Sequence, residues 1–587
     1  MIDNKNMILA IVLSIAILVG FQVYFDATRP PPPEQPLVSD QNTAPGGGDM
    51  SHLPAITAGT PGNAAAPVIP GTIATPLQGT SRDQILARDN RIKINTSRLH
   101  GSIALTGGRI DDLTLVDYRE DLDPDSSEIV LLSPKGVAGG YYAQFGWVGA
   151  QGIVVPGQDT VWTSNSRSLS PEKPITLTWD NGAGLLFKRT FAIDENYMFT
   201  VVQTVENKSG VVAAMNPYGL VSRRGTPETT GFYILHEGLL GVSDQTLSEI
   251  DYDDLKDEGQ IKQTSTGGWI GITDKYWLTA LIPDQKQKTE TRYLHRAQGL
   301  IDTYQVDFLG PQVSVPSGGS ISSESHFFAG AKEVKLLDAY EEQIGVGQFD
   351  LAIDFGWFYF LTKPLFYALL WINDHVQNLG VAILLLTVGI KAVLFPLANK
   401  SYVSMSKMKK LAPKMTAMRE RFGDDKMKLN QAMMELYKKE KVNPASGCLP
   451  ILIQIPVFFA LYKVLFVTIE MRHAPFFGWI QDLSAPDPTT IFNLFGLLPF
   501  TPPDFLMIGI WPLIMGVSMF LQQKLNPQPT DPVQAKIFTF LPIIFTFLLA
   551  AFPAGLVIYW AWNNTLSMAQ QWVIMRRMGI SGKDALK

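Results

Sequence analysis

The chain has 587 residues, of which 46% are hydrophobic and 17% are charged, and its formal net charge is −6. This length predicts two or more domains, and the small, unevenly spread negative charge excludes a general affinity for nucleic acid. The only cysteine, Cys448, excludes a disulfide framework and a cysteine-based metal site. We expect neither a metal nor a cofactor.

Residues 1–26 contain the apolar run Met7–Phe25, which is close to the roughly 20 residues that cross the hydrocarbon core of a bilayer. A cleaved signal peptide is the alternative, but its apolar region is usually shorter and ends in a small-residue cleavage site. We therefore predict an N-terminal transmembrane anchor. Residues 27–80 are rich in Pro, Gly and Ala with few charges, which predicts a disordered linker.

Between residues 81 and 345 the pattern changes to alternating apolar and polar residues with turn residues between the runs. The clearest examples are Thr190–Val205, with a turn around Glu195, and Tyr276–Ile282. Many short strands without intervening helices predict a large β-sandwich domain. Ala331–Ile344 then has the pattern of a helix that ends near Gly345.

This β domain has no recognisable set of paired catalytic groups. Its histidines are scattered, and the chain has no HExxH, GxSxG or nucleotide-binding glycine motif. Asp111 and Asp112 are expected to face solvent rather than to catalyse. We therefore predict a scaffold or docking surface, and we do not expect the chain to be an enzyme.

After Asp354 the sequence becomes strongly apolar. Residues 350–374 include Trp357–Trp371, which is crowded with aromatic residues, and we predict an amphipathic helix that lies in the membrane interface. Residues 375–577 hold five predicted spans, which make six transmembrane helices with the anchor. These spans are Leu379–Ala398, Leu449–Glu470, Phe505–Gln523, Ile537–Phe552 and Gly555–Met575.

The positive charges of the loops orient these spans. Residues 400–441 carry twelve Lys and Arg against five Asp and Glu, whereas residues 471–504 carry Arg472 alone as a Lys or Arg. Positively charged loops stay in the cytoplasm. We therefore predict a multi-pass protein whose N-terminus and tail, 578–587, are cytoplasmic and whose β domain is exported.

Lys391 lies inside the first of these five spans, nine residues before Lys400, which is about 13 Å along a helix. A charged side chain at this depth is costly in a bilayer. Its amine can snorkel toward the cytoplasmic headgroups, or it can face a water-filled cavity. The position alone favours neither alternative.

Polar residues on other spans favour the cavity. Thr387 lies one turn before Lys391 on the same helix face, Gln454 lies in the second span and Asn563 in the last. They can form hydrogen bonds between helices or line one groove. The absence of an evident intramembrane carboxylate partner argues against an ion-coupled transporter, and a partner from outside could supply the negative charge. Further polar residues in these spans are Ser518, Gln522, Gln523, Asn564, Gln570 and Gln571.

The cytoplasmic segment 400–441 predicts a helical hairpin with basic outer faces. An apolar stripe with three- and four-residue spacing is expected to form mostly the core of this hairpin. Methionine is adaptable, so an exposed part could receive varied apolar segments, and the basic faces could rest on anionic lipid. The stripe consists of Met405, Met408, Leu411, Met415 and Met418.

Several long strings, in order, resemble the YidC/Oxa/Alb family of membrane protein insertases over about residues 350–580. The anchor and the β domain, with the weaker string Gly267–Pro283 (GGWIGITDKYWLTALIP), resemble the Gram-negative form of that family. The strings are Thr387–Leu397 (TVGIKAVLFPL), Met408–Lys426 (MKKLAPKMTAMRERFGDDK), Asn443–Leu465 (NPASGCLPILIQIPVFFALYKVL), Ala474–Pro488 (APFFGWIQDLSAPDP) and Phe552–Val573 (FPAGLVIYWAWNNTLSMAQQWV).

The resemblance implies a five-helix insertase core around a hydrophilic groove open to the cytoplasm and to lipid, and an exported β-supersandwich. The family's groove cation falls on Lys391, where bacterial members commonly have Arg, so the charge is kept but the planar bidentate group is lost. Substrate-contacting positions fall on Thr387, Tyr559 and Trp560.

The implied function is the insertion and folding of nascent membrane proteins in the phospholipid bilayer of the Gram-negative inner membrane. The resemblance implies that this occurs alone or with the Sec translocon, and the ribosome is a further candidate partner. Two alternatives stay open. A small-molecule transporter or channel would show solute flux, and an assembly factor bound to a translocon would not insert proteins when purified alone.

Overall fold

The computed structural model describes residues 81–577 except for 232–233, 300, 424, 441–448, 496–497, 499, 501, 504–506 and 526–531. The predicted anchor 1–26, the linker 27–80, the tail 578–587 and Cys448 therefore lie outside the described residues. All described residues belong to one compact unit, Ala66–Lys587.

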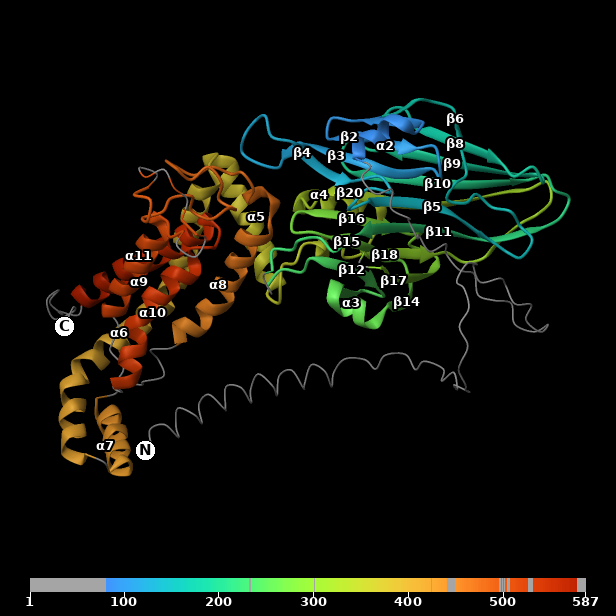
Figure 1. Cartoon of the computed structure of the whole chain (residues 1–587). Coiled ribbons are helices and arrows are strands. Elements are labelled where there is room, and N and C mark those ends of the chain that lie inside the picture. The colour runs from blue at the N-terminus through green and yellow to red at the C-terminus, as the bar shows by residue number, and fades with distance from the viewer. Residues whose placement is uncertain are drawn as a thin grey trace, which may run out of the picture. The chain divides into compact units, whose positions relative to one another are not determined.

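The first part of this unit is a β domain built of two large, mostly antiparallel sheets (Figure 1). One sheet has eleven strands in the order β14-β17-β18-β11-β5-β3-β2-β1-β7, with β19 beside β11 and β4 beside β3. Its strands are β1 (Arg91–Asn95), β2 (Leu99–Ala104), β3 (Arg109–Arg119), β4 (Glu128–Leu132), β5 (Tyr141–Gly149), β7 (Ser168–Leu169), β11 (Ala213–Arg224), β14 (Gln260–Thr266), β17 (Lys288–Gln298), β18 (Ile301–Leu309) and β19 (Val313–Val315).

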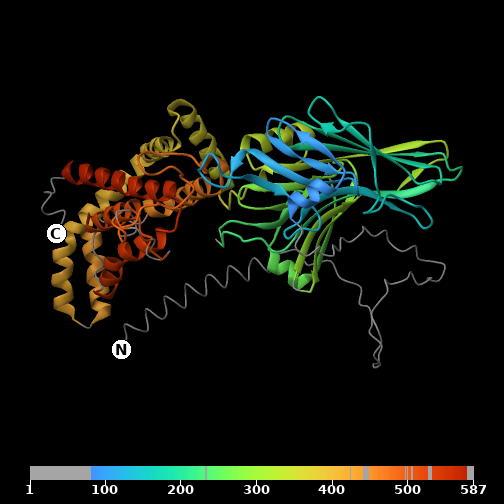
Figure 2. The ribbon, with the colours of Figure 1, turned by 45° about the horizontal axis from the view of Figure 1, so that its top comes forward.

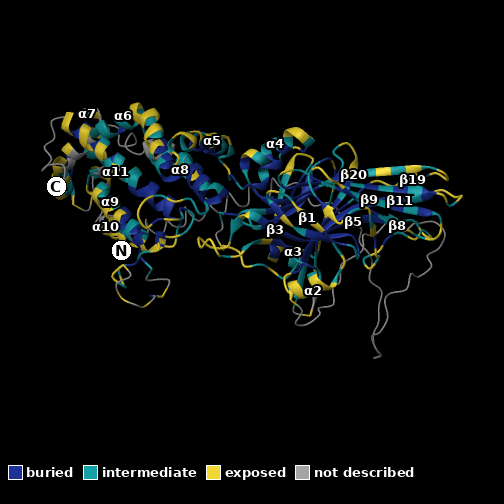
Figure 3. Cartoon of the chain, turned by 90° about the horizontal axis from the view of Figure 1, so that it is seen from above, coloured by how far each residue is buried: buried dark blue, intermediate teal, exposed yellow. Residues whose placement is uncertain are grey.

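The second sheet has nine strands in the order β13-β12-β15-β16-β20-β10-β9-β8-β6. Buried apolar residues of both sheets belong to one core cluster, and the interior of the β domain is accordingly dark blue in Figure 3. The strands are β6 (Thr163–Ser164), β8 (Ile175–Asp180), β9 (Leu185–Ile193), β10 (Met198–Asn207), β12 (Gly238–Ser243), β13 (Thr246–Ile250), β15 (Trp269–Thr273), β16 (Trp277–Ile282) and β20 (Ser320–Ala331).

The hairpin of β9 and β10 shows how the alternating pattern becomes structure. The strands pair antiparallel from Phe199 opposite Ile193 to Asn207 opposite Leu185. Buried residues alternate along both strands, as expected for a sheet with one face in the core. The two strands predicted around the turn at Glu195 are confirmed, and so is the strand predicted to end at Ile282.

The expectation that Asp111 and Asp112 face solvent is wrong. Both lie on β3 inside the larger sheet, and they are 2% and 5% exposed. Asp111 forms an ion pair with Arg91, and Asp112 forms one with Arg82. Burying a carboxylate is costly unless it is paired and hydrogen-bonded, and these arginines, which are distant in sequence, make the burial possible. The Arg91 pair links β1 with β3, and the Arg82 pair links the helix that contains Arg82 to β3.

Short helices surround the β domain. They are α2 (Arg82–Arg88), α3 (Tyr252–Glu258), α4 (Val334–Ile344) and the 3₁₀ turn η1 (Phe349–Ala352). The predicted helix end at Gly345 is confirmed, because this glycine caps α4 with φ 74°, a conformation that glycine adopts without strain.

Helix α5 (Tyr359–Val376) occupies the predicted interfacial segment. Lys363 on α5 pairs with Asp338 of α4 at 2.8 Å and with Asp350 of η1 at 2.6 Å. These contacts fix one face of α5 against the end of the β domain. Trp371 is 65% exposed, so an aromatic side chain remains free for an apolar or interfacial surrounding.

Helix α6 (Leu379–Phe422) runs for 44 residues from the first predicted core span into the predicted hairpin. The hairpin is completed by α7 (Lys426–Lys439). Figures 1 and 2 both show the last part of α6 beside α7. Leu411, Met415 and Leu436 form the buried core of this hairpin.

The remaining helices are α8 (Leu449–Val467), α9 (Ile510–Leu525), α10 (Pro532–Leu549) and α11 (Ala554–Arg577). Helix α11 contacts α9, α6 and α8, and α8 contacts α5. Among the described residues, one helix is long and apolar enough to cross a membrane, Leu379–Ser404 with a mean hydropathy of 2.3, while Gln454–Val467 and Lys536–Leu549 are shorter apolar helices.

Candidate functional site

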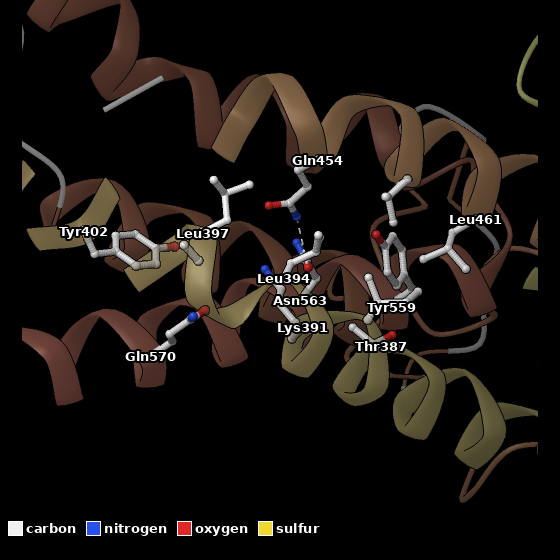
Figure 4. A pocket seen from close by; sticks show the side chains of 13 residues that line it. Thr387, Lys391, Leu394, Leu397, Tyr402, Gln454, Leu461, Tyr559, Asn563 and Gln570 are labelled. Atoms are coloured by element: carbon white, nitrogen blue, oxygen red, sulfur yellow. Dashed lines mark hydrogen bonds between the residues drawn. The ribbon is translucent and has the colours of Figure 1, made fainter. Parts of the chain in front are cut away.

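A small cavity lies between α6, α8 and α11 (Figure 4). Its volume is about 30 Å³, which is room for only a few water molecules. Most of its wall is aliphatic, and the polar part of the wall consists of Thr387, Lys391, Tyr402, Gln454, Tyr559, Asn563 and Gln570.

Lys391 is held at this cavity by the last helix. Its Nζ donates a hydrogen bond to Ser567 Oγ at 2.7 Å. Ser567 is 2% exposed, and its hydroxyl donates to the carbonyl of Asn563 at 2.8 Å. Because this serine is fixed by its own helix backbone, it directs the ammonium toward α11. Lys391 therefore lines this cavity in the structure.

The charge of Lys391 has no internal counter-ion among the described residues. No acidic side chain lines the cavity, and no ion pair of Lys391 is found in the described part of the chain. An ammonium group has three N–H donors, and one of them is used by the neutral Ser567 hydroxyl. The site can therefore take an anionic or strongly polar acceptor.

The other predicted groove residues differ in their hydrogen bonds and in their burial. Gln454 Nε2 on α8 donates to Asn563 Oδ1 on α11 at 3.2 Å, the contact drawn as a dashed line in Figure 4. Thr387 Oγ1 donates to the carbonyl of Ile383 at 2.7 Å, so its hydroxyl proton is satisfied within α6. Tyr559 is 2% exposed and lies at the apolar end of the cavity.

Trp560 is the one predicted contact residue of α11 that the cavity wall does not include. It is 8% exposed and stacks on Phe458 of α8, with 5.8 Å between ring centroids and 13° between planes. Its indole N–H has no partner among the described residues. In this structure Trp560 packs α11 against α8.

The second polar stripe of α11 serves helix packing. Asn564 Nδ2 donates to Ser518 Oγ on α9 at 3.1 Å, and Gln571 Nε2 donates to the carbonyl of Leu525 at 3.1 Å. These residues follow the cavity residues Asn563 and Gln570 by one position, so they point to another helix face. Asn564 and Gln571 thus form hydrogen bonds between helices, whereas Asn563 both lines the cavity and bonds to Gln454 on α8.

The methionines of the hairpin are mostly internal. Met415 is 7% exposed, and Met408 and Met418 pack partly buried against it. The side chain of Met405 lies outside the described residues. The exposed apolar surface of the hairpin is instead on α7, where Met427 is 76% and Met434 57% exposed.

Two polar residues at the site, Ser567 and Tyr402, were not predicted, and Gln570 was predicted only as one of the further polar residues of the spans. Tyr402 follows Lys391 by eleven positions, which is three helical turns, but the sequence placed it in the cytoplasmic segment. Ser567 and Gln570 follow Asn563 by four and seven positions, and this helical spacing is the signal that could have identified them.

The sequence of the chain is similar to those of known proteins. Residues 91–368 match the model of the YidC periplasmic domain, and residues 371–581 match that of the 60Kd inner membrane protein. A membrane protein insertase YidC of Methylobacterium radiotolerans is 54% identical over 98% of this chain and 96% of its own length. The chain belongs to the YidC family of membrane protein insertases. The corresponding protein of Methylobacterium sp. (strain 4-46) is 53% identical over the same shares of both chains.

Membership in the YidC family places the chain in the bacterial inner membrane, with a β-rich periplasmic domain and a helical C-terminal region. It is an insertase family rather than an enzyme family. A solved structure described as an active YidC insertase with its first transmembrane domain resolved is 20% identical and covers 82% of this chain and 92% of its own, with a TM-score of 0.34. At that score the likeness decides nothing further.

Proposed function

We propose that the chain inserts nascent inner-membrane proteins, alone or with the Sec translocon, by accepting a polar flank of the substrate at the cavity of Lys391. The observation that carries this proposal is the uncompensated ammonium between α6 and α11, which is held by a neutral serine. A substrate carboxylate or backbone carbonyl supplies the missing acceptor. The ammonium thereby lowers the cost of bringing a polar group into an apolar surrounding.

The small volume of the cavity fits a resting state. A volume of about 30 Å³ does not hold a peptide segment, so α6, α8 and α11 move apart when a substrate enters. The hydrogen bonds that join them, Gln454 to Asn563 and Lys391 to Ser567, are the contacts that an incoming polar segment exchanges for its own.

The apolar part of the substrate leaves toward lipid along exposed apolar faces. Val393 on α6 is 79% exposed and Trp572 on α11 is 49% exposed. Burial of apolar surface in the bilayer drives the step, and the membrane potential aids the export of acidic segments.

The exposed methionines of α7 are the proposed first contact of an apolar segment in the cytoplasm. Met427 and Met434 belong to an exposed, strongly basic helix pair. Flexible thioether side chains adapt to varied apolar sequences, and the basic surroundings suit anionic lipid and ribosomal RNA.

The proposed topology has six spans, with the N-terminus and the tail in the cytoplasm of a Gram-negative cell. It rests on the charge asymmetry between residues 400–441 and 471–504. Helix α6 supports it, because this one helix connects the predicted outer boundary at Leu379 with the basic hairpin.

The test is insertion into proteoliposomes of the purified full chain with a single-span substrate that carries either an acidic or a neutral tail. We expect Lys391→Glu to lower insertion of the acidic-tailed substrate at least tenfold, about 1.4 kcal/mol, and to affect the neutral-tailed one less. Lys391→Arg keeps the charge and should retain most activity.

The matched control is Lys524→Glu, the same charge change at an exposed position on α9 outside the cavity wall. It should leave both substrates unaffected. Equal insertion of the acidic-tailed substrate by Lys391→Glu and by the parent chain would overturn the electrostatic part of the proposal.

A further inference from the structure

A second cavity lies at the junction of α5 and α6, far along α6 from Lys391. Its volume is about 470 Å³, which is within the usual range of small-molecule sites. The end of α5 contributes Asn373, Asp374 and Gln377, and Leu370 and Leu379 form the apolar part of the wall. Glu470 contributes from the other side, after α8.

Glu470 is presented to this cavity by a short, well-anchored turn. It lies in the 3₁₀ turn η3 (Ile469–Met471), whose neighbouring residues Ile469 and Met471 are 3% and 0% exposed. Its Oε2 is buried and has no hydrogen-bond partner among the described residues. Leaving a buried carboxylate oxygen without a hydrogen-bond donor is energetically costly. The anchored turn keeps the carboxylate at this place despite that cost.

Protein cations do not neutralise the cavity in this structure. Lys335 on α4 approaches Asp374 at 3.9 Å, with side chains that are 59% and 62% exposed, and an exposed pair of this kind contributes little. No ion pair of Glu470 is found in the described part of the chain. Two acidic residues therefore line one cavity, and one carboxylate oxygen of Glu470 is buried without a donor among the described residues.

The remaining polar wall is fixed. Asn378 accepts a hydrogen bond from the amide of Val381 at 3.0 Å and donates to the carbonyl of Phe476 at 3.2 Å. It caps α6 and ties it to the segment after Glu470. These two hydrogen bonds fix the orientation of Asn378 in the cavity wall. Glu470 Oε2 is therefore left without a donor among the described residues.

We propose that this cavity binds an ammonium group, with Glu470 as its buried counter-ion and Asp374 at its entrance. An ammonium supplies up to three donors and a positive charge, and Leu370 and Leu379 accommodate the short alkyl part beside it. The group can be the ethanolamine headgroup of a phospholipid, since the neighbouring α5 carries exposed aromatic residues typical of a membrane interface. A soluble amine offers the same chemistry. This site is separate from the Lys391 cavity and goes beyond the proposed insertion step.

The first experiment measures lipid retention by the full chain with native mass spectrometry, using phosphatidylethanolamine and phosphatidylglycerol in equal amounts. We expect at least fivefold preference for phosphatidylethanolamine, and loss of that preference in Glu470→Gln. The control Glu342→Gln, an exposed residue of α4, should keep it. Equal retention of both lipids by the parent chain, or an unchanged preference in Glu470→Gln, would overturn the lipid source.

The second arm uses free ethanolamine as the probe, titrated into lipid-stripped protein by calorimetry. Binding that depends on Glu470 supports the site with a soluble amine as its ligand, even where the lipids are not distinguished. Absence of both lipid preference and ethanolamine binding overturns the proposal. A third variant, Lys335→Met, removes the nearest protein cation and should strengthen binding, whereas weaker binding would contradict an ammonium site.

Discussion

At the residue scale, Lys391 could be found from the sequence because it is a lone cation in a long apolar run. The spacing of Ser567 from Asn563 places it on the same helix face, but its pairing with Lys391 could not be predicted because the two residues lie 176 positions apart. Asp111 was misplaced for the same reason, since its partner Arg91 lies on another strand. The environment of such residues depends on contacts between segments that are distant in sequence, and a single sequence does not show these contacts.

His236 provides a pH-dependent contact in the β domain. Its Nε2 donates to the carbonyl of Leu239 at 2.9 Å, and its Nδ1 lies 3.2 Å from Asp251 Oδ1. Both nitrogens face acceptors, which favours the doubly protonated ring. Burial lowers the pKa of His236. The hydrogen bond to Asp251 and the charge of Glu249 raise this pKa by more than burial lowers it, so the pKa lies above its ordinary value.

The raised pKa of His236 determines how the stability of the fold changes with pH. A protonated His236 stabilises the folded state fully below its unfolded pKa of about 6.5, and this stabilisation is lost as pH rises through the folded pKa. We expect Asp251→Asn to lower the stability of the full chain more at pH 6 than at pH 9. The difference should be below about 1 kcal/mol, since Asp251 is largely exposed. Thermal unfolding at both pH values measures it, and an equal loss would contradict the assignment.

At the element scale, the helical hairpin has buried methionines on α6 and exposed methionines on α7. The three- and four-residue spacing correctly predicted an internal stripe with Met415 in its core. It did not predict that the exposed methionines are on α7. The continuation of α6 through both segments was also not predicted, because Pro396 and Pro413 usually end or kink a helix.

We expect Met415→Gln and the pair Met427→Gln with Met434→Gln to act differently. The buried change should destabilise the hairpin by about 2–3 kcal/mol and speed hydrogen exchange of α7. The exposed pair should leave exchange unchanged and reduce cross-linking of a stalled nascent chain to the hairpin. Unchanged cross-linking in the exposed pair would show that these methionines are not the receiving surface.

At the scale of the whole molecule, the sequence predicted a β domain followed by a helical region but not the contacts between them. Lys463 of α8 pairs with Asp354, which follows the β domain, at 2.6 Å and also donates to the carbonyl of Ile234. Asp354 in turn accepts from the amide of His236 at 3.3 Å. A lysine in an apolar helix therefore connects the two regions, which its sequence surroundings do not reveal.

The ion pair between Lys463 and Asp354 should stabilise the folded chain. We expect Asp354→Asn and Lys463→Met each to lower the unfolding free energy by about 3 kcal/mol, because each leaves a largely buried charge without its partner. The double variant should lose less than the sum. A double-mutant cycle from denaturant unfolding of the full chain measures the coupling. Strict additivity would mean that the pair does not couple the two regions.

The central claim is that the cavity between α6, α8 and α11 receives the nascent chain. The most direct measurement places a photoreactive residue at Leu394, which lines the cavity, or at Phe540, which is 59% exposed on α10, and cross-links it to a stalled nascent membrane protein. The account predicts strong cross-linking from position 394 and little from position 540, with loss of the former in Lys391→Glu. Equal cross-linking from both positions, or none from position 394, would contradict it.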